Sequence, residues 1–193
     1  MNKINEIAPK TSLIIITGLP GTGKTTLGKK LAEEFHLPFI CKDDIKELLF
    51  DGLGWKDREW SKKIGGLSMD LLYYAAELNL KAEKSLIMET NFNPKFADKK
   101  FLDFKEKYNF APFQVRCITN GEILFDRFAK RANSDRHPGH TDSENLDEWR
   151  PILLQGKIEA LNIEGEIFDI DTSDFNKVDY SGLISAIKSA TNV

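Results

Sequence analysis

The feature that most constrains the fold is a glycine-rich segment near the start of the chain. Gly18 to Thr25 reads GLPGTGKT and satisfies the pattern G-x-x-x-x-G-K-[ST]. It follows the β-branched apolar run from Leu13 to Thr17, which predicts a short strand buried on both faces. After it, Leu27, Leu31 and Phe35 recur every four residues and predict the apolar stripe of a helix. Strand, glycine loop and helix in this order are the setting that a phosphate-binding loop, or P-loop, requires.

The chemistry of such a loop predicts a nucleotide site. Its glycines let backbone N–H groups point inward around a phosphate chain, and the following helix turns the positive end of its dipole toward the same anion. We expect ATP as the nucleotide, with Lys24 reaching its β- and γ-phosphates and Thr25 offering a hydroxyl to Mg²⁺. A glycine turn that merely joins strand to helix is the alternative, and the placement of the motif argues against it. The expected nucleotide contacts within this segment are Gly18, Gly21, Thr22, Gly23, Lys24, Thr25 and Thr26.

The rest of the chain alternates strand and helix patterns. Further strands are predicted at 38–41, 85–88, 113–119 and 167–170, and further helices at 43–50, 57–83, 94–104, 122–131, 146–158 and 178–187. This alternation indicates an α/β fold, a P-loop NTPase with three αβα layers around a central five-stranded parallel sheet. Gly65-Gly66 would weaken its helix by about 1 kcal/mol each, which predicts a bend or close packing there.

Length and composition favour one domain. No Pro/Gly/Ser-rich linker divides the 193 residues, so we interpret 1–193 as a single P-loop domain, with a lid of helix and loop at about 126–145. The net charge of −3 gives no global attraction to nucleic acid. No apolar run could span a bilayer and the first ten residues lack a signal-peptide core, so we expect a cytoplasmic protein with no membrane partner. Cys41 and Cys117 fit buried reduced thiols better than a disulfide framework.

A P-loop alone does not show where the γ-phosphoryl group goes, so a base is the next candidate. The segment Cys41-Lys42-Asp43-Asp44-Ile45-Lys46 places two carboxylates at the end of a predicted strand, with Lys46 one helical turn after Asp43. One carboxylate could face the crevice while Lys46 holds an anion. Two N-capping aspartates and a solvated lysine explain the same residues equally well.

Arginines supply the candidate charge stabilisation. Arg127 and Arg131 are four residues apart on a predicted helix, and Arg136 follows in the polar stretch from Asn133 to Ser143, which suits a mobile loop. Three guanidinium groups could therefore converge on one anion. Arginine from a closing lid would neutralise the charge that develops on a transferring phosphoryl group and would exclude water. An ordinary basic helix face is the alternative, and the P-loop upstream favours the lid.

Other polar residues have weaker signals. Glu89 closes a predicted strand, where its carboxylate could orient a magnesium-bound water, and Asn91 could contact the acceptor; strand-end hydrogen bonding is the alternative for Asn91. His137, His140 and Asp142 would give zinc only three ligands from a flexible loop, so contact with substrate is the better interpretation.

Four motifs together resemble a known family. GLPGTGKT, KDDIK, IMETNFNP and the two arginines of DRFAKR are similar to the kinase domain of bacteriophage polynucleotide kinase and to the small P-loop kinases around it, including zeta-toxin-like and chloramphenicol phosphotransferase-like enzymes. The motifs occur in family order from about residue 13 to residue 171. The resemblance implies that Asp43 takes the proton from the acceptor hydroxyl, that Arg131 stabilises the transferring phosphoryl group and that Arg127 lies against the nucleotide. It also implies that 171–173 pass near the adenine.

The sequence departs from this family at one position. Lys46 stands where the polynucleotide kinase has an arginine that contacts the acceptor's phosphate, and lysine keeps the charge but loses the bidentate fork. A polynucleotide acceptor is therefore less favoured than a small molecule. The net charge of −3 and the lack of a basic stretch interleaved with aromatic residues point the same way.

The leading hypothesis is an ATP-dependent kinase that phosphorylates a hydroxyl of a small-molecule acceptor. The alternatives are a kinase of polynucleotide or nucleotide 5′-hydroxyls and a nucleotide-binding switch or ATPase. The pattern identifies neither the acceptor, nor the preference for ATP over GTP, nor the oligomeric state. The expected catalytic residues are Lys24, Asp43 and Arg131, the expected substrate contacts are Asp44, Lys46, Asn91 and Arg136, and the expected magnesium contacts are Thr25 and, through water, Glu89.

Overall fold

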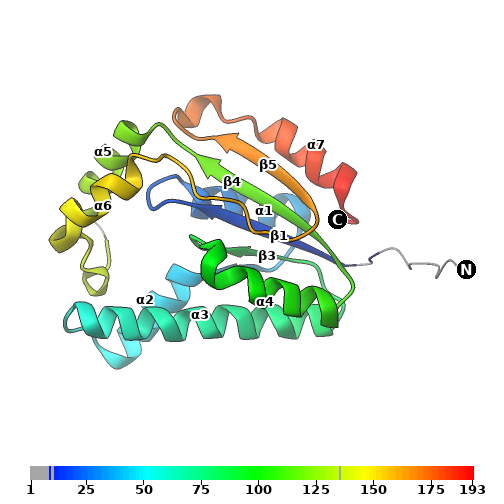
Figure 1. Ribbon diagram of the computed structural model, residues 1–193, viewed down its shortest axis with the longest axis horizontal. Coiled ribbons are helices and arrows are strands. Elements are labelled where there is room, and N and C mark those ends of the chain that lie inside the picture. The colour runs from blue at the N-terminus through cyan, green and yellow to red at the C-terminus, as the bar shows by residue number, and fades with distance from the viewer. Residues whose placement is uncertain (1–8, 10, 135) are drawn as a thin grey trace, which may run out of the picture.

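The protein is an α/β sandwich built on a five-stranded parallel sheet (Figure 1), as the alternating pattern predicts. The computed structural model describes residues 9, 11–134 and 136–193. The strand order in the sheet is β2-β3-β1-β4-β5. The strands are β1 (Thr11–Gly18), β2 (Phe39–Cys41), β3 (Leu86–Glu89), β4 (Phe110–Ile118) and β5 (Glu166–Asp171).

Seven α-helices and three short 3₁₀ turns are found in the described residues. The helices are α1 (Lys24–Phe35), α2 (Lys42–Leu53), α3 (Arg58–Lys81), α4 (Pro94–Lys107), α5 (Gly121–Ala132), α6 (Leu146–Leu153) and α7 (Tyr180–Ala190). The 3₁₀ turns are η1 (Pro138–His140), η2 (Asp142–Asn145) and η3 (Phe175–Lys177).

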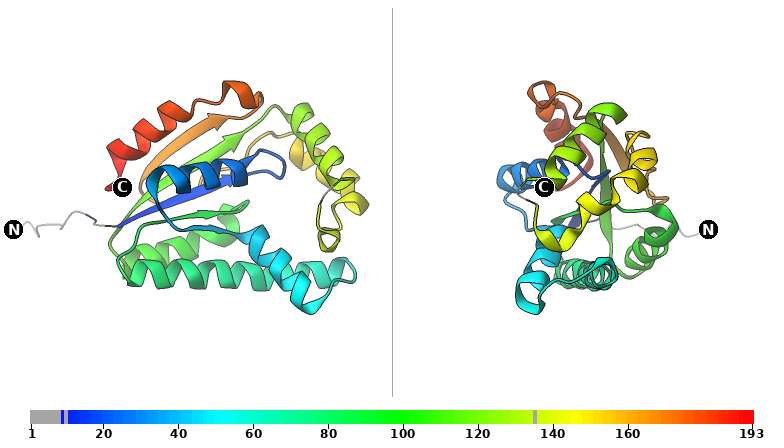
Figure 2. Two further views of the ribbon diagram at one scale, coloured as in Figure 1. Left: turned by 180° about the vertical axis from the view of Figure 1, so that it is seen from behind. Right: turned by 90° about the vertical axis from the view of Figure 1, so that its left-hand side faces the viewer.

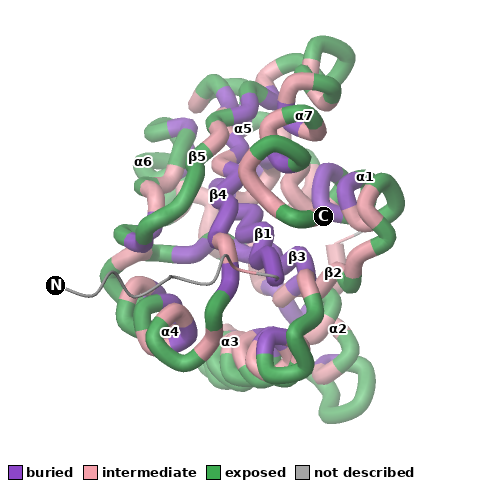
Figure 3. The backbone as a smooth tube through the Cα atoms, turned by 90° about the vertical axis from the view of Figure 1, so that its right-hand side faces the viewer, coloured by how far each residue is buried: buried purple, intermediate pink, exposed green. Residues whose placement is uncertain are grey.

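The sheet is buried on both faces because β1 alternates its side chains between two apolar clusters. Leu13 and Ile15 pack with α3 and α4 on one face, and Ile14 and Ile16 pack with α1 and α7 on the other. All four are fully buried. Viewed along the sheet, the buried residues concentrate on β1, β3 and β4, and the helices turn exposed faces outward (Figure 3). The sequence prediction of a strand buried on both faces is confirmed.

The start of α2 decides between the two interpretations of the aspartate pair. The helix begins at Lys42 with Cys41 as its N-cap, and Asp43 and Asp44 lie inside its first turn without a side-chain capping bond. The interpretation as N-capping aspartates is therefore wrong. Carboxylates in a first turn are still favoured there by the positive end of the helix dipole.

The long helix α3 runs through Gly65-Gly66 without interruption (Figure 1). Asp57 caps its N-terminus by accepting a hydrogen bond from the Trp60 backbone N–H at 2.9 Å. Packing supports the glycines, because Ile64 and Leu72 on the inner face are buried. The close packing expected at the glycines is not found, because a Cβ at Gly65 would lie at an ordinary contact distance of 3.7 Å from Lys46 Cε and a Cβ at Gly66 would meet nothing within 4 Å.

The segment that follows α5 is more structured than the sequence suggests. It forms η1 and η2, and Gly139 and His140 are buried against α2 and α3, although residue 135 of the expected lid lies outside the described residues. Gly139 lies so close to Phe50 that a Cβ would meet the ring at 2.5 Å. The predicted helix at 146–158 ends earlier, at Leu153, because Gly156 adopts a positive φ of 72°.

Two smaller expectations concern the cysteines and the membrane. Cys41 and Cys117 are free and buried. Within the described residues, no helix is both long and apolar enough to cross a bilayer.

Candidate functional site

A cavity of about 280 Å³ opens at the carboxyl ends of β1 and β3. Ligands of open α/β sheets collect at this edge. The loop between β1 and α1 reaches toward α5 and α6, and α2 and α3 lie on its other side (Figures 1 and 2). The residues that line the cavity are Pro20, Lys24, Lys42, Asp43, Lys46, Arg58, Ser61, Lys62, Gly65, Glu89, Thr90, Asn91, Arg131, Arg136, His140, Thr141, Asp142, Asn145 and Trp149.

The P-loop adopts backbone conformations that need glycine. Gly21 and Gly23 have φ values of 92° and 82°, and Gly23 is the N-cap of α1. A Cβ at Gly23 would also meet the Phe175 ring at 2.7 Å. Thr22 is buried and its hydroxyl donates to the Leu19 carbonyl at 2.9 Å, which ties the loop to itself. The result is a fixed curve of backbone N–H groups at a helix N-terminus, suited to an anion.

Glu89 joins the P-loop lysine and threonine at the end of β3. It accepts a hydrogen bond from the Thr25 hydroxyl at 2.7 Å, and its other oxygen lies 3.6 Å from Lys24 Nζ. The Cys41 thiol donates to the same carboxylate at 3.0 Å. Glu89 is only 3% exposed, so its charge is balanced by these neighbours rather than by bulk water.

The Thr25 and Glu89 pair fits a magnesium ion by its donor type. A hydroxyl and a carboxylate supply the hard oxygen ligands that Mg²⁺ prefers, and the adjacent P-loop leaves room for phosphate oxygens to complete the shell. Bound there, the ion would supply neutralisation of charge on the phosphates. The cysteine behind Glu89 is buried, and burial followed by the Glu89 carboxylate raises the pKa of the Cys41 thiol, so it stays a neutral donor.

Asp43 faces the cavity from the first turn of α2. Its Oδ2 accepts a hydrogen bond from Arg136 at 2.9 Å, and its Oδ1 lies 3.5 Å from Lys42 Nζ. Burial alone would raise the pKa of Asp43, but the charges of Lys42 and Arg136 outweigh it and hold that pKa well below its usual range. Asp43 is therefore an ionised carboxylate, and a carboxylate has about four lone-pair positions, so it can accept a further hydrogen bond.

Arg136 is the centre of the acidic contacts on this side. Besides Asp43, it contacts Asp142 at 3.1 Å and Glu47 at 3.3 Å. Burial would lower the pKa of Arg136, but these carboxylates, Asp43 first, raise it. The guanidinium therefore links the 3₁₀ turns after α5 to α2, across 93 residues of sequence.

His140 completes this network. Its Nδ1 lies 2.9 Å from Arg136 Nη2 and its Nε2 lies 2.8 Å from a Glu47 carboxylate oxygen. Because an arginine can only donate, Nδ1 must accept and Nε2–H must donate, which fixes a neutral imidazole. Burial and then the Arg136 charge lower the pKa of His140 to about 3. His137 does not hydrogen-bond to Arg136 or Glu47; its Nε2 lies 3.4 Å from Asp51 Oδ1. In the described residues, no group of three His, Cys, Asp or Glu side chains could hold a metal ion.

Arg131 also lines the cavity, and it is less fully paired. One of its terminal nitrogens lies 3.6 Å from Asp142, and its buried Nε has no hydrogen-bond partner in the described structure. Burial, followed by the charge of Arg136, lowers the pKa of Arg131. An unsatisfied buried donor is costly, so this guanidinium is suited to receive an anion.

Eight of the predicted residues do not line the cavity, and they are Gly18, Gly21, Thr22, Gly23, Thr25, Thr26, Asp44 and Arg127. Arg127 donates to the Thr172 and Ser173 carbonyls at 2.8 and 2.7 Å and lies 3.9 Å over the Phe175 ring. It thus fixes the segment after β5 beside the P-loop. Thr26 and Asp44 are exposed and do not line the cavity.

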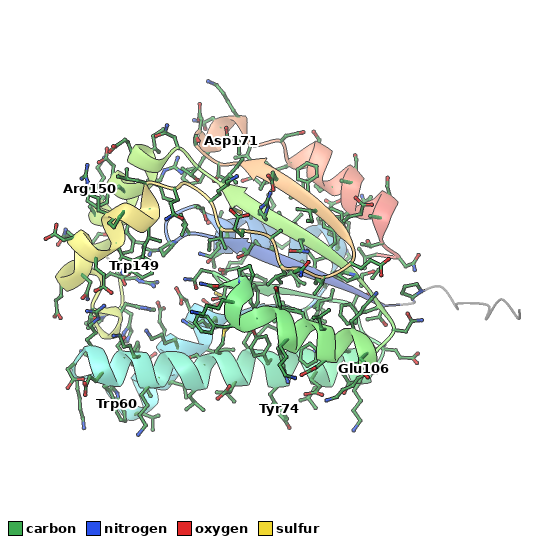
Figure 4. The ribbon with its side chains drawn as sticks, in the orientation of Figure 1. Trp60, Tyr74, Glu106, Trp149, Arg150 and Asp171 are labelled. Carbon is green, nitrogen blue, oxygen red and sulfur yellow. The ribbon has the colours of Figure 1, made fainter. Side chains whose placement is uncertain are left out.

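The structure adds residues that the sequence reasoning missed. The cavity is also lined from the start of α3 and from α6. The residues are Arg58, Ser61, Lys62 and Gly65 on α3 and Trp149 on α6. Figure 4 shows Trp149 on the side of α6 that faces α2 and α3, whereas Tyr74 points away from the sheet. The one available signal was the spacing of Arg58 and Lys62, which puts two cations on one face at the start of a helix.

The chain is similar to known proteins in both sequence and structure. The profile of one family, described as an AAA domain (AAA_33), matches residues 13–152. The solved structure of a candidate kinase from Chloroflexus aurantiacus j-10-fl is 36% identical, with a TM-score of 0.84 over 94% of this chain and 98% of that one.

Two curated relatives are kinases of different small molecules. The cytidylate kinase of Methanococcus aeolicus is 26% identical over 176 residues, 86% of this chain and 98% of the relative. The shikimate kinase of Paracidovorax citrulli is 36% identical over 74 residues, 37% of this chain and 40% of the relative. The chain spans less than half the length of the first curated relatives that it matches, which are shikimate kinases. It covers nearly the whole length of the cytidylate kinase.

Proposed function

The chain belongs to the AAA domain family (AAA_33), and we propose that it is a kinase that transfers the γ-phosphoryl group of ATP to a hydroxyl of a small-molecule acceptor. The observation that carries the proposal is the meeting of Lys24 and Asp43 in one cavity, together with Arg131. A phosphate-binding lysine, a carboxylate and an arginine from three separate segments are the parts that phosphoryl transfer needs. The kinases named among the relatives support the same class of reaction.

The nucleotide half of the site is the P-loop with Glu89. The backbone of 18–25 would bind the β- and γ-phosphates, and Lys24 would exchange its contact with Glu89 for a phosphate oxygen. Thr25 and Glu89 would hold Mg²⁺, Glu89 through a water. Arg127 would act indirectly. It holds the segment after β5 in place through two hydrogen bonds, and the nucleotide base would lie beside that segment.

Asp43 is the proposed base on the acceptor side. Its low pKa makes it a weak proton acceptor, yet the loose transition state of phosphoryl transfer needs little proton removal before the bond to phosphorus forms. Asp43 would accept a hydrogen bond from the acceptor hydroxyl and so orient the attacking oxygen, and it would take the proton as the phosphoryl group arrives. Asn91, at the end of β3, lines the same cavity and could hold the acceptor in place.

Arg131 and Arg136 are the proposed charge stabilisers. We treat residues 126–145 as a lid within one domain of 193 residues, whose closure would bring both guanidinium groups to the transferring phosphoryl group. Arg136 already bonds to Asp43, so it also sets the position of the base.

A screen for acceptors tests the proposal. The purified chain, γ-labelled ATP and Mg²⁺ are incubated with nucleosides, sugars, sugar acids, antibiotics and 5′-hydroxyl oligonucleotides, with Asp43→Asn as the blank. We expect label in at least one small acceptor and a rate about 100-fold lower in the variant. Near wild-type turnover by a folded Asp43→Asn would remove Asp43 as the base.

Two other outcomes would change the assignment. Label on the oligonucleotide alone, lost steeply with added salt, would make the chain a polynucleotide kinase. Label released only as inorganic phosphate would make it an ATPase or a nucleotide-dependent switch.

A further inference from the structure

The cavity has almost entirely polar walls, and Trp149 on α6 is the main exception. Lysine, arginine, carboxylate, hydroxyl and amide side chains line it from the P-loop, α2, α3, the end of β3 and the 3₁₀ turns. Among the described lining residues, Trp149 offers the one large apolar surface, since Pro20 and Gly65 present little carbon. Most ligand pockets have the opposite balance, with mainly apolar walls and a few polar groups. One aromatic wall opposite many polar groups therefore suits an acceptor with one apolar face and polar edges.

Packing behind the indole holds Trp149 in place. The centroids of the Trp149 and Phe128 rings are 5.7 Å apart, at an interplanar angle of 47°. Trp149 is half-buried against a cluster of fully packed side chains that also contains Leu19 of the P-loop. The core therefore supports the inner side of the indole and fixes its position relative to the P-loop, while its remaining surface lines the cavity.

An ion pair joins α6 to α3 beside Trp149. Arg58, the first residue of α3, donates to the carboxylate of Glu148, which directly precedes Trp149. Both side chains are at least 40% exposed, so the pair positions α6 rather than contributing much stability. Trp149 lies on the side of α6 that faces α2 and α3 (Figure 4). An acceptor in the cavity would therefore lie between the indole and the polar side chains of these two helices.

The indole N–H of Trp149 is available to a ligand. Within the part of the chain that the structure describes, this group has no hydrogen-bond partner, whereas Trp60 Nε1 donates to the Gly54 carbonyl at 2.9 Å. A tryptophan N–H can only donate. Trp149 therefore offers the cavity both an apolar surface and one donor for an oxygen.

We infer that the acceptor is a single saturated ring with several hydroxyls, a monosaccharide or a cyclitol, whose C–H face packs on Trp149. The inference deepens the proposed kinase function and rests on it. In such a ring the hydroxyls project from the edge, and the C–H groups, polarised by the neighbouring oxygens, meet the negative face of the indole. The hydroxyl beside Asp43 is the one phosphorylated: its oxygen bonds to the γ-phosphorus, its proton passes to Asp43, and ADP leaves.

The size of the cavity limits the acceptor to one ring. Its volume of about 280 Å³ is at the lower end of the range for ligand pockets, about 300–1,000 Å³, and the γ-phosphate must share it. The polar side chains opposite Trp149, among them Ser61 and Asn91, would exchange hydrogen bonds with the remaining hydroxyls. An open-chain polyol offers the same hydroxyls but no fixed apolar face, so it should bind less well.

Ring and open-chain polyols test the class of acceptor. Monosaccharides and myo-inositol are each compared with the alditol of the same number of carbons, which keeps the hydroxyls and removes the ring. Nucleosides are included because an aromatic base could also stack on an indole. We expect kcat/KM to be about tenfold or more higher for at least one monosaccharide or cyclitol than for its alditol and for the nucleosides.

Variants of Trp149 test the stacking surface. Trp149→Leu keeps apolar bulk against Phe128 but removes the aromatic face and the N–H, so KM for the ring should rise about tenfold and kcat should change much less. Trp149→Phe keeps an aromatic face and should raise KM less. Trp55→Phe is the control, because Trp55 is 49% exposed and does not line the cavity. KM for ATP should stay unchanged in all three variants.

Fluorescence reports the contact in a protein that keeps Trp149. The chain has three tryptophans, so the double variant Trp55→Phe, Trp60→Phe leaves Trp149 as the single one. Monosaccharides and myo-inositol are titrated separately into this protein, saturated with a non-hydrolysable ATP analogue. At least one of them should change the emission with saturation, and its alditol should not do so at the same concentrations. A tryptophan that only packs against the core would not respond.

The outcomes separate the two proposals. Equal use of rings and alditols, preference for nucleosides over both, or a folded Trp149→Leu enzyme with unchanged KM overturns the ring site while the kinase function stands. If no acceptor is phosphorylated, the kinase function fails, and the single-tryptophan protein then decides on the site. A saturable change in emission with a monosaccharide or myo-inositol supports the ring site, and no change with any of them overturns it.

Discussion

The two halves of the cavity are built in different ways. The nucleotide half is contiguous in sequence, since eight residues from Gly18 to Thr25 provide most of it and only Glu89 comes from elsewhere. The acceptor half is assembled from α2, α3, the end of β3, the 3₁₀ turns and α6. The first half recognises a phosphate chain that is common to all nucleotides, mainly through backbone groups. The second must recognise one acceptor, and it does so through side chains.

The two halves also differ in what holds them. The P-loop directly follows β1, whose residues 13–16 are fully buried. Hydrophobic packing of β1 therefore fixes the position of the loop. The acceptor half is held by charges, chiefly the contacts of Arg136 with Asp43 and Glu47. Variants in the first half should therefore affect every phosphoryl transfer. Variants in the second half should affect which acceptor is phosphorylated, or how the free energy of unfolding depends on pH.

The largest effect is expected at Lys24. Lys24→Met removes the cation that would stabilise charge on the γ-phosphate, and transfer should fall about 10³-fold. The loss should be the same for every acceptor and for hydrolysis by water. The fold should persist, because Glu89 keeps its hydrogen bonds from Thr25 and Cys41.

Steady-state rates with the acceptor and without it measure this effect. Lys29→Met is the control, because Lys29 is exposed on α1 outside the cavity. If Lys24→Met slowed transfer to one acceptor and spared hydrolysis, the division into a general and a selective half would be wrong.

A smaller effect is expected at Glu89. Glu89→Gln keeps the size of the side chain but removes a charge from the magnesium position, so about tenfold more Mg²⁺ should be needed for half-maximal rate. KM for the acceptor should stay unchanged, because Glu89 contacts Lys24 and Thr25 rather than α3. A magnesium titration of the rate measures this, with the exposed Glu33→Gln on α1 as control. An unaltered titration curve would place the ion elsewhere.

The same division explains what the sequence could predict. The five strands and the P-loop follow from local patterns, and each expected strand is found with its ends within three residues of those predicted. The role of Gly23 also follows, because the motif demands a left-handed backbone at a helix start. These are properties of neighbours in the chain.

The acceptor half could not be predicted because its contacts join distant segments. Asp43 and Arg136 are 93 residues apart, and no local pattern tells an aspartate in a first turn from an N-capping one. The sequence predicts that the glycine pair destabilises its helix. The space that Gly65 leaves at Lys46 becomes visible only when α2 is placed beside α3. Burial of His140 depends likewise on how the 3₁₀ turns pack against α2 and α3.

The smallest expected effect concerns His140 and the stability of the acceptor half. His140 has a pKa of about 3 in the folded chain against an ordinary value of 6.5, so the unfolded chain binds the additional proton first. The free energy of unfolding should therefore fall as pH decreases from about 6.5 toward 3. Protonation of Nδ1 would break its hydrogen bond with Arg136 and set two cations side by side.

His140→Gln should lose part of this dependence, because glutamine can still contact Glu47 or Arg136 but does not titrate. Urea unfolding of wild type and variant at several pH values between 7 and 4 measures the difference. His36→Asn is the matched control, since His36 is exposed and has a left-handed backbone that asparagine tolerates. If His140→Gln and His36→Asn changed the pH dependence equally, the neutral imidazole would not be what ties the 3₁₀ turns to α2. The acceptor half would then depend on Arg136 alone.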